Sequence, residues 1–299
     1  MVNFKLHSLQ NFSEEEVDAW IDDGMKKVAE KMNIDVQTLQ EMIRLQSEEI
    51  ESRARFPTID INTAERRELR NQIVEDYFEE FADAKKEKTA IVVLGQIASG
   101  KSSFCKSLLE NDHAFVVDVD YIKQGYGTMP GLMFEFDNGK GTTQIHEEAS
   151  MLSKQIISLA SDHGYNLVIP KTGVNYYSIE KILTDLKSKG YFVGLAYVDL
   201  PIKKCIERNF YRYVDEYLSG RPSRLIPFQD IKAINDNPFL TFVRFLKNKQ
   251  SGLVDSFVAM SNDVAPGMPM EPIPLESIVQ FEESEKQSVT TTEQLKKIG

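Results

Sequence analysis

Residues 95–102 read Gly95-Gln-Ile-Ala-Ser-Gly100-Lys101-Ser102 and match the pattern G-x-x-x-x-G-K-S/T. The apolar run 90–94 (AIVVL) precedes them and the helical pattern 102–110 (SSFCKSLLE) follows, which is the order of strand, loop and helix that a phosphate-binding loop (P-loop) requires. Such a loop turns backbone N–H groups inward around phosphates, aided by the positive end of the helix. We expect Lys101 to reach the β- and γ-phosphates and Ser102 to hold Mg²⁺. The predicted nucleotide contacts are Gly95, Gln96, Ile97, Ala98, Ser99, Gly100, Lys101, Ser102 and Ser103.

Short apolar runs alternate with helical patterns after this motif. They are 114–120 (AFVVDVD), 166–170 (NLVIP), 191–200 (YFVGLAYVDL) and 253–260 (LVDSFVAM). Apolar runs bounded by turns and separated by helices are typical of a parallel sheet that is buried on both faces. The pattern predicts an α/β fold with a mainly parallel sheet. The glycine-rich segment 124–143 is expected to be a loop.

The N-terminal third is predicted to be helical. Ser13 and Glu16 are spaced for a capping box that opens a helix over 13–32, and a second amphipathic helix is expected over 35–55. A third should begin near Asn62, with Glu65 placed to complete its cap. We divide the chain into a helical extension (1–60), a P-loop domain (61–261) and a tail (262–299) that is partly extended or disordered.

Charge and composition exclude several classes of protein. The chain has 299 residues and a net charge of −11, of which residues 1–60 carry −6 and residues 261–299 carry −4. This acidity counts against a protein that coats nucleic acid. No apolar run is long enough for a signal peptide or for the roughly 20 residues of a membrane span. With only two cysteines, too few for a disulfide framework, we expect a cytoplasmic protein.

Two carboxylates end the second apolar run. Ligands of open α/β sheets gather beyond the carboxyl ends of strands, so Asp118 and Asp120 should lie near the nucleotide. Alternation along a strand would point both side chains to one face. We expect one of them to order Mg²⁺ or its waters and the other to accept a proton from a substrate hydroxyl.

A basic cluster follows the fourth run. Mobile arginines can neutralise the charge that phosphoryl transfer spreads over the γ-phosphate oxygens, and this role is predicted for Arg212, Arg221 and Arg224. Lys203, Lys204 and Arg208 are expected on a solvated basic face.

Weaker candidates for substrate binding lie at two other places. Glu147 and Glu148 begin a helix, where carboxylates also complement the helix dipole without any function. Lys171 and Thr172 follow another strand and could meet a substrate. No histidine or cysteine has metal-site spacing, and no Ser/His/Asp hydrolase arrangement is present.

The motifs together resemble the zeta toxin family of P-loop kinases from toxin–antitoxin systems. The resemblance covers residues 62–260, and the matching runs are GQIASGKSS (95–103), VVDVDYIK (116–123), HEEAS (146–150), GYNLVIPKTG (164–173), KGYFVGLAYVDLP (189–201) and ERNFYRYVDEYLSGRPSR (207–224). It implies a P-loop kinase-like three-layer sandwich. It also implies transfer of the γ-phosphate of ATP or GTP to a hydroxyl of a UDP-amino sugar such as UDP-N-acetylglucosamine.

The resemblance assigns roles residue by residue. Asp120 matches the general base, Arg212 one arginine of the lid, and Arg224, or else Arg221, the other. Thr172 matches a substrate-contacting threonine. A separate antitoxin is an implied partner.

The acceptor pocket departs from the family pattern. Lys154 stands where known members have a glutamate that contacts the sugar nucleotide, and 170–174 (PKTGV) replaces an acidic-Gly-Thr-Gly-Arg run. Ile97 and Ala98 stand where Pro-Gly is common. An exchange of carboxylate for ammonium reverses a local charge, so the same acceptor is not implied.

Two other functions share the P-loop. One is a kinase that acts on polynucleotide ends or tRNA, which the acidity and the lack of interleaved aromatic and basic residues oppose. The other is a binding module with a degenerate P-loop, which the intact Lys101, Ser102 and Asp120 oppose. Residues 1–60 are either a tethered, antitoxin-like cap that inhibits the kinase or a docked structural extension.

Overall fold

A computed structural model describes residues 13–53, 60–125, 132, 145–219, 226, 228–234, 237–265 and 267–282. Arg221, Arg224 and nearly all of the predicted loop 124–143 lie outside these ranges. Within them, none of the helices has the length and apolar character needed to cross a membrane.

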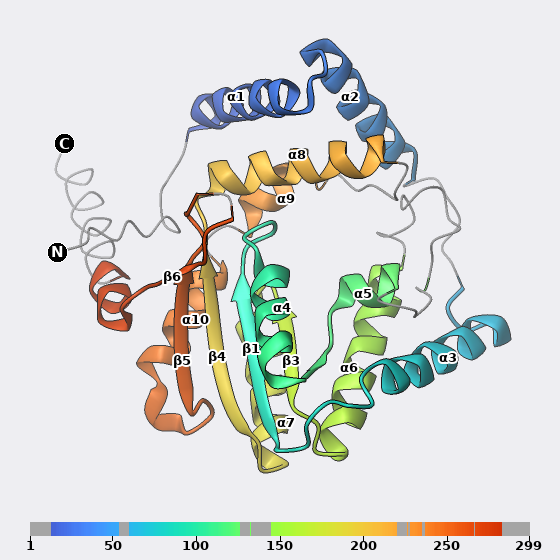
Figure 1. The fold of residues 1–299 in the computed structure, drawn as a ribbon, viewed down its shortest axis with the longest axis vertical. Helices are drawn as coiled ribbons and strands as arrows, with labels where there is room; N and C mark the ends of the chain where they lie inside the picture. The colour runs from blue at the N-terminus through green and yellow to red at the C-terminus, as the bar shows by residue number, and fades with distance from the viewer. Residues whose placement is uncertain are drawn as a thin grey trace, which may run out of the picture.

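A six-stranded sheet in the order β2-β3-β1-β4-β5-β6 forms the centre of the described structure (Figure 1). The first five strands in this order are parallel, and β6 pairs antiparallel with β5. The strands are β1 (Thr89–Gly95), β2 (Phe115–Val116), β3 (Leu167–Lys171), β4 (Phe192–Asp199), β5 (Ser256–Ser261) and β6 (Glu271–Pro272). The predicted α/β fold with a mainly parallel sheet is confirmed.

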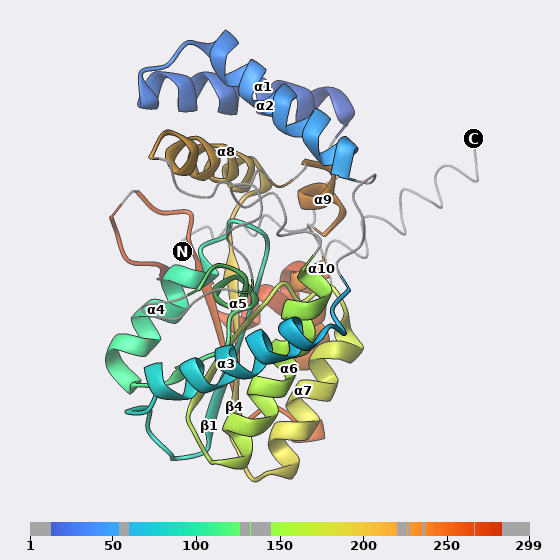
Figure 2. The same ribbon diagram turned by 90° about the vertical axis from the view of Figure 1, so that its right-hand side faces the viewer.

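Helices cover both faces of the sheet: α4 packs on one face, α7 and α10 on the other (Figures 1 and 2). The helices are α1 (Glu14–Met32), α2 (Val36–Arg53), α3 (Ala64–Glu80), α4 (Lys101–Asp112), α5 (Val119–Gln124), α6 (His146–Asp162), α7 (Tyr176–Ser188), α8 (Ile202–Leu218), α9 (Phe228–Ala233) and α10 (Asn237–Lys247), with a short 3₁₀ turn at Lys249–Ser251. This makes the predicted three-layer sandwich.

The strand β1 lies inside the sheet, between β3 and β4, and helices pack on both faces of the sheet. Val92, Val93 and Leu94 are fully buried in the main core. Register places Leu94 beside Lys171 of β3 and Gly95 beside Val198 of β4. The carboxyl ends of three strands therefore meet where the P-loop begins.

Two local expectations need correction. The second strand ends at Val116, and Asp118 is the N-cap of α5 instead of a strand residue. The third helix is capped by Thr63, whose side chain accepts from the backbone N–H of Arg66, and Asn62 lies outside it. In the predicted tail, the structure describes residues 262–265 and 267–282, of which the extended β6 and the helical residues 275–282 pack on the core through Ile273 and Ile278.

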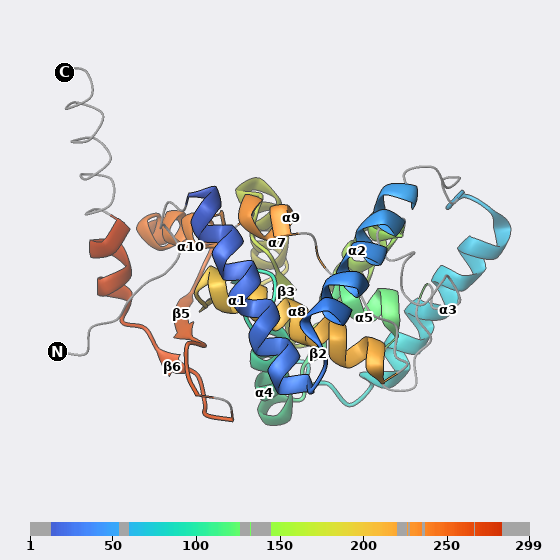
Figure 3. The ribbon, with the colours of Figure 1, turned by 90° about the horizontal axis from the view of Figure 1, so that it is seen from above.

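The N-terminal helices dock on α8, on the side away from the sheet (Figures 1 and 3). The capping box of Ser13 and Glu16 is present as predicted. A second apolar cluster, separate from the main core, joins the two helices to α8 and its surroundings. Its buried members are Met25, Val28, Ala29, Leu39, Met42, Leu200, Ile202, Cys205, Ile206, Phe210, Tyr213, Val214 and Ile231.

Ion pairs border this cluster. Asp23 lies 2.6 Å from the ammonium of Lys203, and Lys27 lies 2.9 Å from Glu207. Bonding to these two lysines lowers the pKa of Asp23. The apolar cluster supplies most of the attachment, because exposed ion pairs contribute about 0–1 kcal/mol each.

Leu39→Ala is expected to destabilise the docked helices by about 2–4 kcal/mol, because Leu39 is fully buried in the second cluster. Trp20, the single tryptophan of the chain, packs against this cluster, so its fluorescence during urea unfolding reports on the attachment. Gln37→Ala, an exposed change on the same helix, is the matched control. Equal unfolding midpoints for the two variants would show that the cluster does not hold the extension.

Candidate active site

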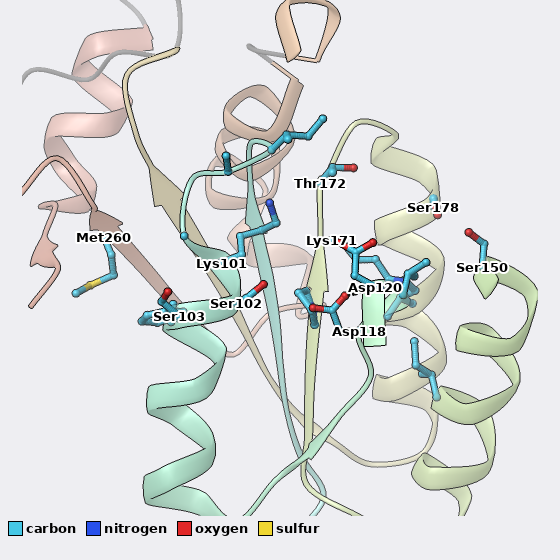
Figure 4. Close-up of a pocket in the computed structure, with 18 of the residues that line it drawn as sticks. Lys101, Ser102, Ser103, Asp118, Asp120, Ser150, Lys171, Thr172, Ser178 and Met260 are labelled. Atoms are coloured by element: carbon cyan, nitrogen blue, oxygen red, sulfur yellow. Dashed lines mark hydrogen bonds between the residues drawn. The ribbon is translucent and has the colours of Figure 1, made fainter. Parts of the chain in front are cut away.

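A cavity of about 1740 Å³ opens at the carboxyl ends of β1 and β3 (Figure 4). Its walls come from the P-loop, α5, α6, α7 and α8. The predicted site residues that line it are Ile97, Ala98, Gly100, Lys101, Ser102, Ser103, Asp118, Asp120, Lys171, Thr172 and Arg212. Gly95, Gln96 and Ser99 lie in the loop but do not face the cavity, and Glu147 and Glu148 do not line it either.

The P-loop has the tight geometry that its glycines allow. At Gly95 a Cβ atom would come within 2.8 Å of both Ser99 Oγ and Val198 O, so a side chain there would displace backbone. Gly100 has φ +100°, a conformation that other residues rarely adopt. Asn262 fixes the loop from outside, because its side-chain amide donates to Ser99 O at 2.7 Å.

Lys101 lies within the loop. Its Nζ donates to Gly95 O at 2.9 Å and to Gln96 O at 2.5 Å. Burial lowers the pKa of this lysine. An ammonium in a buried loop of backbone donors concentrates positive charge where phosphate oxygens would sit.

The two aspartates reach the cavity through the start of α5, not through strand alternation. Asp118 caps the helix by accepting from Asp120 N at 2.9 Å, and Asp120 lies in the first turn. Burial and the neighbouring carboxylate raise the pKa of Asp118 to about 6. Asp120 is about half exposed at 47% and lies 3.4 Å from Nζ of the buried Lys123. A buried carboxylate and an accessible one therefore stand side by side at the cavity.

The oxygen donors present suit Mg²⁺. Ser102 supplies a hydroxyl from the first turn of α4, and Asp118 supplies a carboxylate whose pKa is raised by burial and by the neighbouring Asp120. No group of three or more His, Cys, Asp or Glu side chains gathers for a metal within the described ranges. One carboxylate, one hydroxyl and phosphate oxygens form the kind of site that Mg²⁺ uses with nucleotides.

The helix α8 brings two arginines to the site. Arg212 lines the cavity as predicted. The expectation of a solvated face is wrong for Arg208, which also lines the cavity, donating to Asn262 O at 3.1 Å and lying 3.5 Å from Ser99 O. Its spacing of four from Arg212 was the available signal, since residues at that spacing share a helix face.

Glu148 has a structural role. It is fully buried and pairs with Arg66 and with Arg70, the latter at 2.7 Å, which ties α6 to α3. Arg66 also donates to Leu132 O, and Arg70 to Ile61 O. The predicted substrate contact for Glu148 does not fit this position, because both of its oxygens are engaged by arginines away from the cavity. Its neighbour Glu147 is exposed outside the cavity.

Glu148→Gln is expected to lower the free energy of unfolding by about 3 kcal/mol, since it leaves two partly buried arginines without their carboxylate. Nucleotide affinity should stay near that of the unchanged protein. Denaturant unfolding and nucleotide titration measure the two quantities, with the exposed Glu147→Gln as control. Unchanged stability with weakened acceptor binding would restore the substrate role.

Lysines define the far side of the cavity. Lys171 ends β3 and donates to Ser153 Oγ at 3.2 Å, while Lys154 lines the cavity from α6. Burial lowers the pKa of Lys171 to about 8, and Lys154 adds to this effect. Lys123, which sequence patterns did not single out, also lines the cavity.

Comparison with known proteins identifies the family. The sequence profile described as Zeta toxin matches residues 74–264, well over half of the chain. The chain belongs to the zeta toxin family. Toxin zeta of Enterococcus hirae and Toxin zeta of Streptococcus pyogenes are each 31% identical to it over 157 residues. That alignment covers 49% of this family member and 54% of each relative, so the match spans about half the length of the curated relatives.

Solved structures share the fold of this family member. One comes from the PezAT chromosomal toxin–antitoxin system of Streptococcus pneumoniae, with a TM-score of 0.53, 17% identity, and coverage of 65% of this chain and 79% of that one. Another is AvrRxo1-ORF1:-ORF2 with ATP, with a TM-score of 0.51, 15% identity, and coverage of 71% and 67%. The predicted resemblance to zeta toxins is confirmed at the level of family and fold.

Proposed function

We propose that this protein is a phosphotransferase that moves the γ-phosphate of ATP or GTP to an alcohol group of a small molecule. The observation that carries the proposal is the single cavity in which Lys101 and Ser102 of the P-loop stand with Asp118 and Asp120. A phosphate-binding loop and an accessible carboxylate in one cavity are the parts that phosphoryl transfer to a hydroxyl requires.

Each residue has a distinct task in this reaction. Lys101 and the backbone N–H groups of the loop bind the phosphates. Ser102 and Asp118 would hold Mg²⁺, which neutralises charge on the β- and γ-oxygens. Asp120, about half exposed, accepts the proton of the attacking hydroxyl. Arg212 offers positive charge to the transferring group from α8, with Arg221 and Arg224 proposed for the same role.

The proposed acceptor is a sugar nucleotide, UDP-N-acetylglucosamine or a related nucleotide-like metabolite. Membership of the zeta toxin family supports this class and supports action as a toxin in the cytoplasm, where such metabolites occur. A structural neighbour from a toxin–antitoxin system supports a separate antitoxin as partner.

Residues 1–60 are proposed to regulate the kinase through α8. None of the described residues of α1 and α2 lines the cavity, so these helices do not fill the nucleotide site themselves. They cover α8, which carries Arg208 and Arg212 on its cavity side. Inhibition by this extension would therefore act on the position of α8.

Transfer of label from γ-labelled ATP to defined acceptors tests the function. UDP-N-acetylglucosamine, related sugar nucleotides and RNA with free ends are offered separately, each to the wild type and to Lys101→Ala. We expect Lys101-dependent label in a small molecule and none in RNA. Label in RNA alone would replace the proposal with a polynucleotide kinase.

A further inference from the structure

Of the residues that the structure describes, those that line the cavity include eight lysine and arginine side chains against four aspartates. Lys123, Lys154 and Lys171 line it together with Asp118 and Asp120. Lys123 pairs with Asp120 at 3.4 Å, and Asp118 already accepts the N–H that caps α5. Among the described residues, Lys154 has no carboxylate partner.

Lys154 and Lys171 line the cavity from two elements, α6 and the end of β3, that contact each other. Lys171 is held by Ser153, a fully buried residue of α6, and Lys154 is the next residue of that helix. Lys154 shares its helix face with Ser150, and both line the cavity. Besides burial, which lowers the pKa of Lys171, Asp118 raises it and Lys154 lowers it, so all three charges act in one part of the cavity, where a bound anion would stabilise both ammonium groups.

The position points to the acceptor and not to the nucleotide. In Figure 4, Asp118, Asp120 and Lys171 lie between the P-loop helix, with Ser102 and Ser103, and the helix α6, with Ser150. The nucleotide phosphates would be held from the P-loop side. The lysines on the α6 side would therefore contact the acceptor, whose hydroxyl is placed at Asp120.

We infer that Lys154 and Lys171 form an anion subsite that selects an acceptor with a carboxylate or phosphate close to the reactive hydroxyl. The inference rests on the proposed kinase function, because an acceptor subsite presupposes phosphoryl transfer. It narrows the proposed acceptors to those with an anionic group near the reactive hydroxyl. Within the proposed class of sugar nucleotides and related metabolites, it favours an acceptor whose sugar carries a carboxylate or phosphate over UDP-N-acetylglucosamine, whose charges lie on the diphosphate.

Matched acceptors test the subsite by kcat/KM. The pairs are UDP-glucuronate against UDP-glucose and glucosamine 6-phosphate against glucosamine, and they separate a carboxylate from a phosphate. We expect the wild type to prefer the anionic member of one pair by about tenfold or more. Lys154→Glu, an exposed change, should abolish this preference, and Lys106→Glu, an exposed lysine of α4 outside the cavity, should keep it.

Three results would overturn the inference. The wild type could show no preference for the anionic acceptor, or Lys154→Glu could keep the preference of the wild type. Lys154→Glu could also lower kcat/KM equally for all acceptors while it raises the KM for ATP. The last result would assign the lysines to the nucleotide.

A binding measurement keeps the test independent of catalysis. Calorimetry of inorganic phosphate is performed on protein saturated with Mg²⁺ and a non-hydrolysable ATP analogue. We expect a phosphate site that Lys154→Glu weakens by about tenfold and Lys106→Glu leaves intact. No such site, or one that Lys154→Glu leaves unchanged, would overturn the inference. A Lys154-dependent site without transfer to any acceptor would leave the subsite standing and refute the kinase function.

Discussion

Lys101→Ala is expected to lower kcat/KM for phosphoryl transfer by about 10²–10³-fold, the usual cost of removing one preorganised charge-stabilising group. Lys101 lies inside the P-loop, where Nζ bonds to Gly95 O and Gln96 O, and its charge would pass to the β- and γ-phosphates. In the alanine variant, no ammonium group of the loop 95–103 is left to bind those phosphates.

The control for this prediction is Lys106→Ala. Lys106 is an exposed lysine of the same helix that lies outside the cavity. Steady-state transfer and thermal unfolding are measured on both variants. Near wild-type transfer in Lys101→Ala, with the fold intact, would show that the loop does not activate a nucleotide.

Asp120→Asn is expected to lower kcat by about 10²–10⁴-fold, because the amide cannot accept the proton of the attacking hydroxyl. The KM for ATP should change little, since Asp120 stands beyond the P-loop on α5. The carboxylate is about half exposed, so its replacement should leave the stability of the fold nearly unchanged. The rate is read from labelled product, and the affinity for nucleotide from a separate titration.

Asp118→Asn is the comparison for that variant. Asp118 caps α5 and is the proposed Mg²⁺ contact. The asparagine side chain of Asp118→Asn carries no charge, so this variant should need a higher Mg²⁺ concentration for half-maximal rate. If Asp120→Asn shifts the Mg²⁺ requirement and keeps its kcat at saturating Mg²⁺, the general-base role belongs elsewhere.

The parts of the structure that depend on local pattern were predictable from sequence. The strand β1 with its P-loop and α4 followed from one motif, and the capping box of Ser13 and Glu16 fixed the start of α1. The order of apolar runs was enough for the parallel sheet, because strands joined through helices lie parallel. These features involve residues that are close in sequence.

Features that join distant residues were not predictable. Glu148 meets Arg66 and Arg70, which lie 82 and 78 positions earlier, so its first-turn location in α6 suggested only a helix-dipole or substrate role. The spacing of four indicates that Arg208 shares a helix face with Arg212, but the approach of Arg208 to Ser99 of the P-loop depends on where α8 packs, which the spacing does not reveal. The strand at 114–120 was overestimated because the N-cap side chain of Asp118 begins a helix inside the apolar run.

The most informative measurement is phosphorylation in a metabolite extract. Wild-type protein and Lys101→Ala are incubated with ATP, Mg²⁺ and the extract, and the products are compared by mass spectrometry. We predict a small molecule that gains the mass of one phosphoryl group with the wild type and not with Lys101→Ala. An extract that stays unchanged with folded, ATP-binding wild-type protein would contradict a small-molecule kinase.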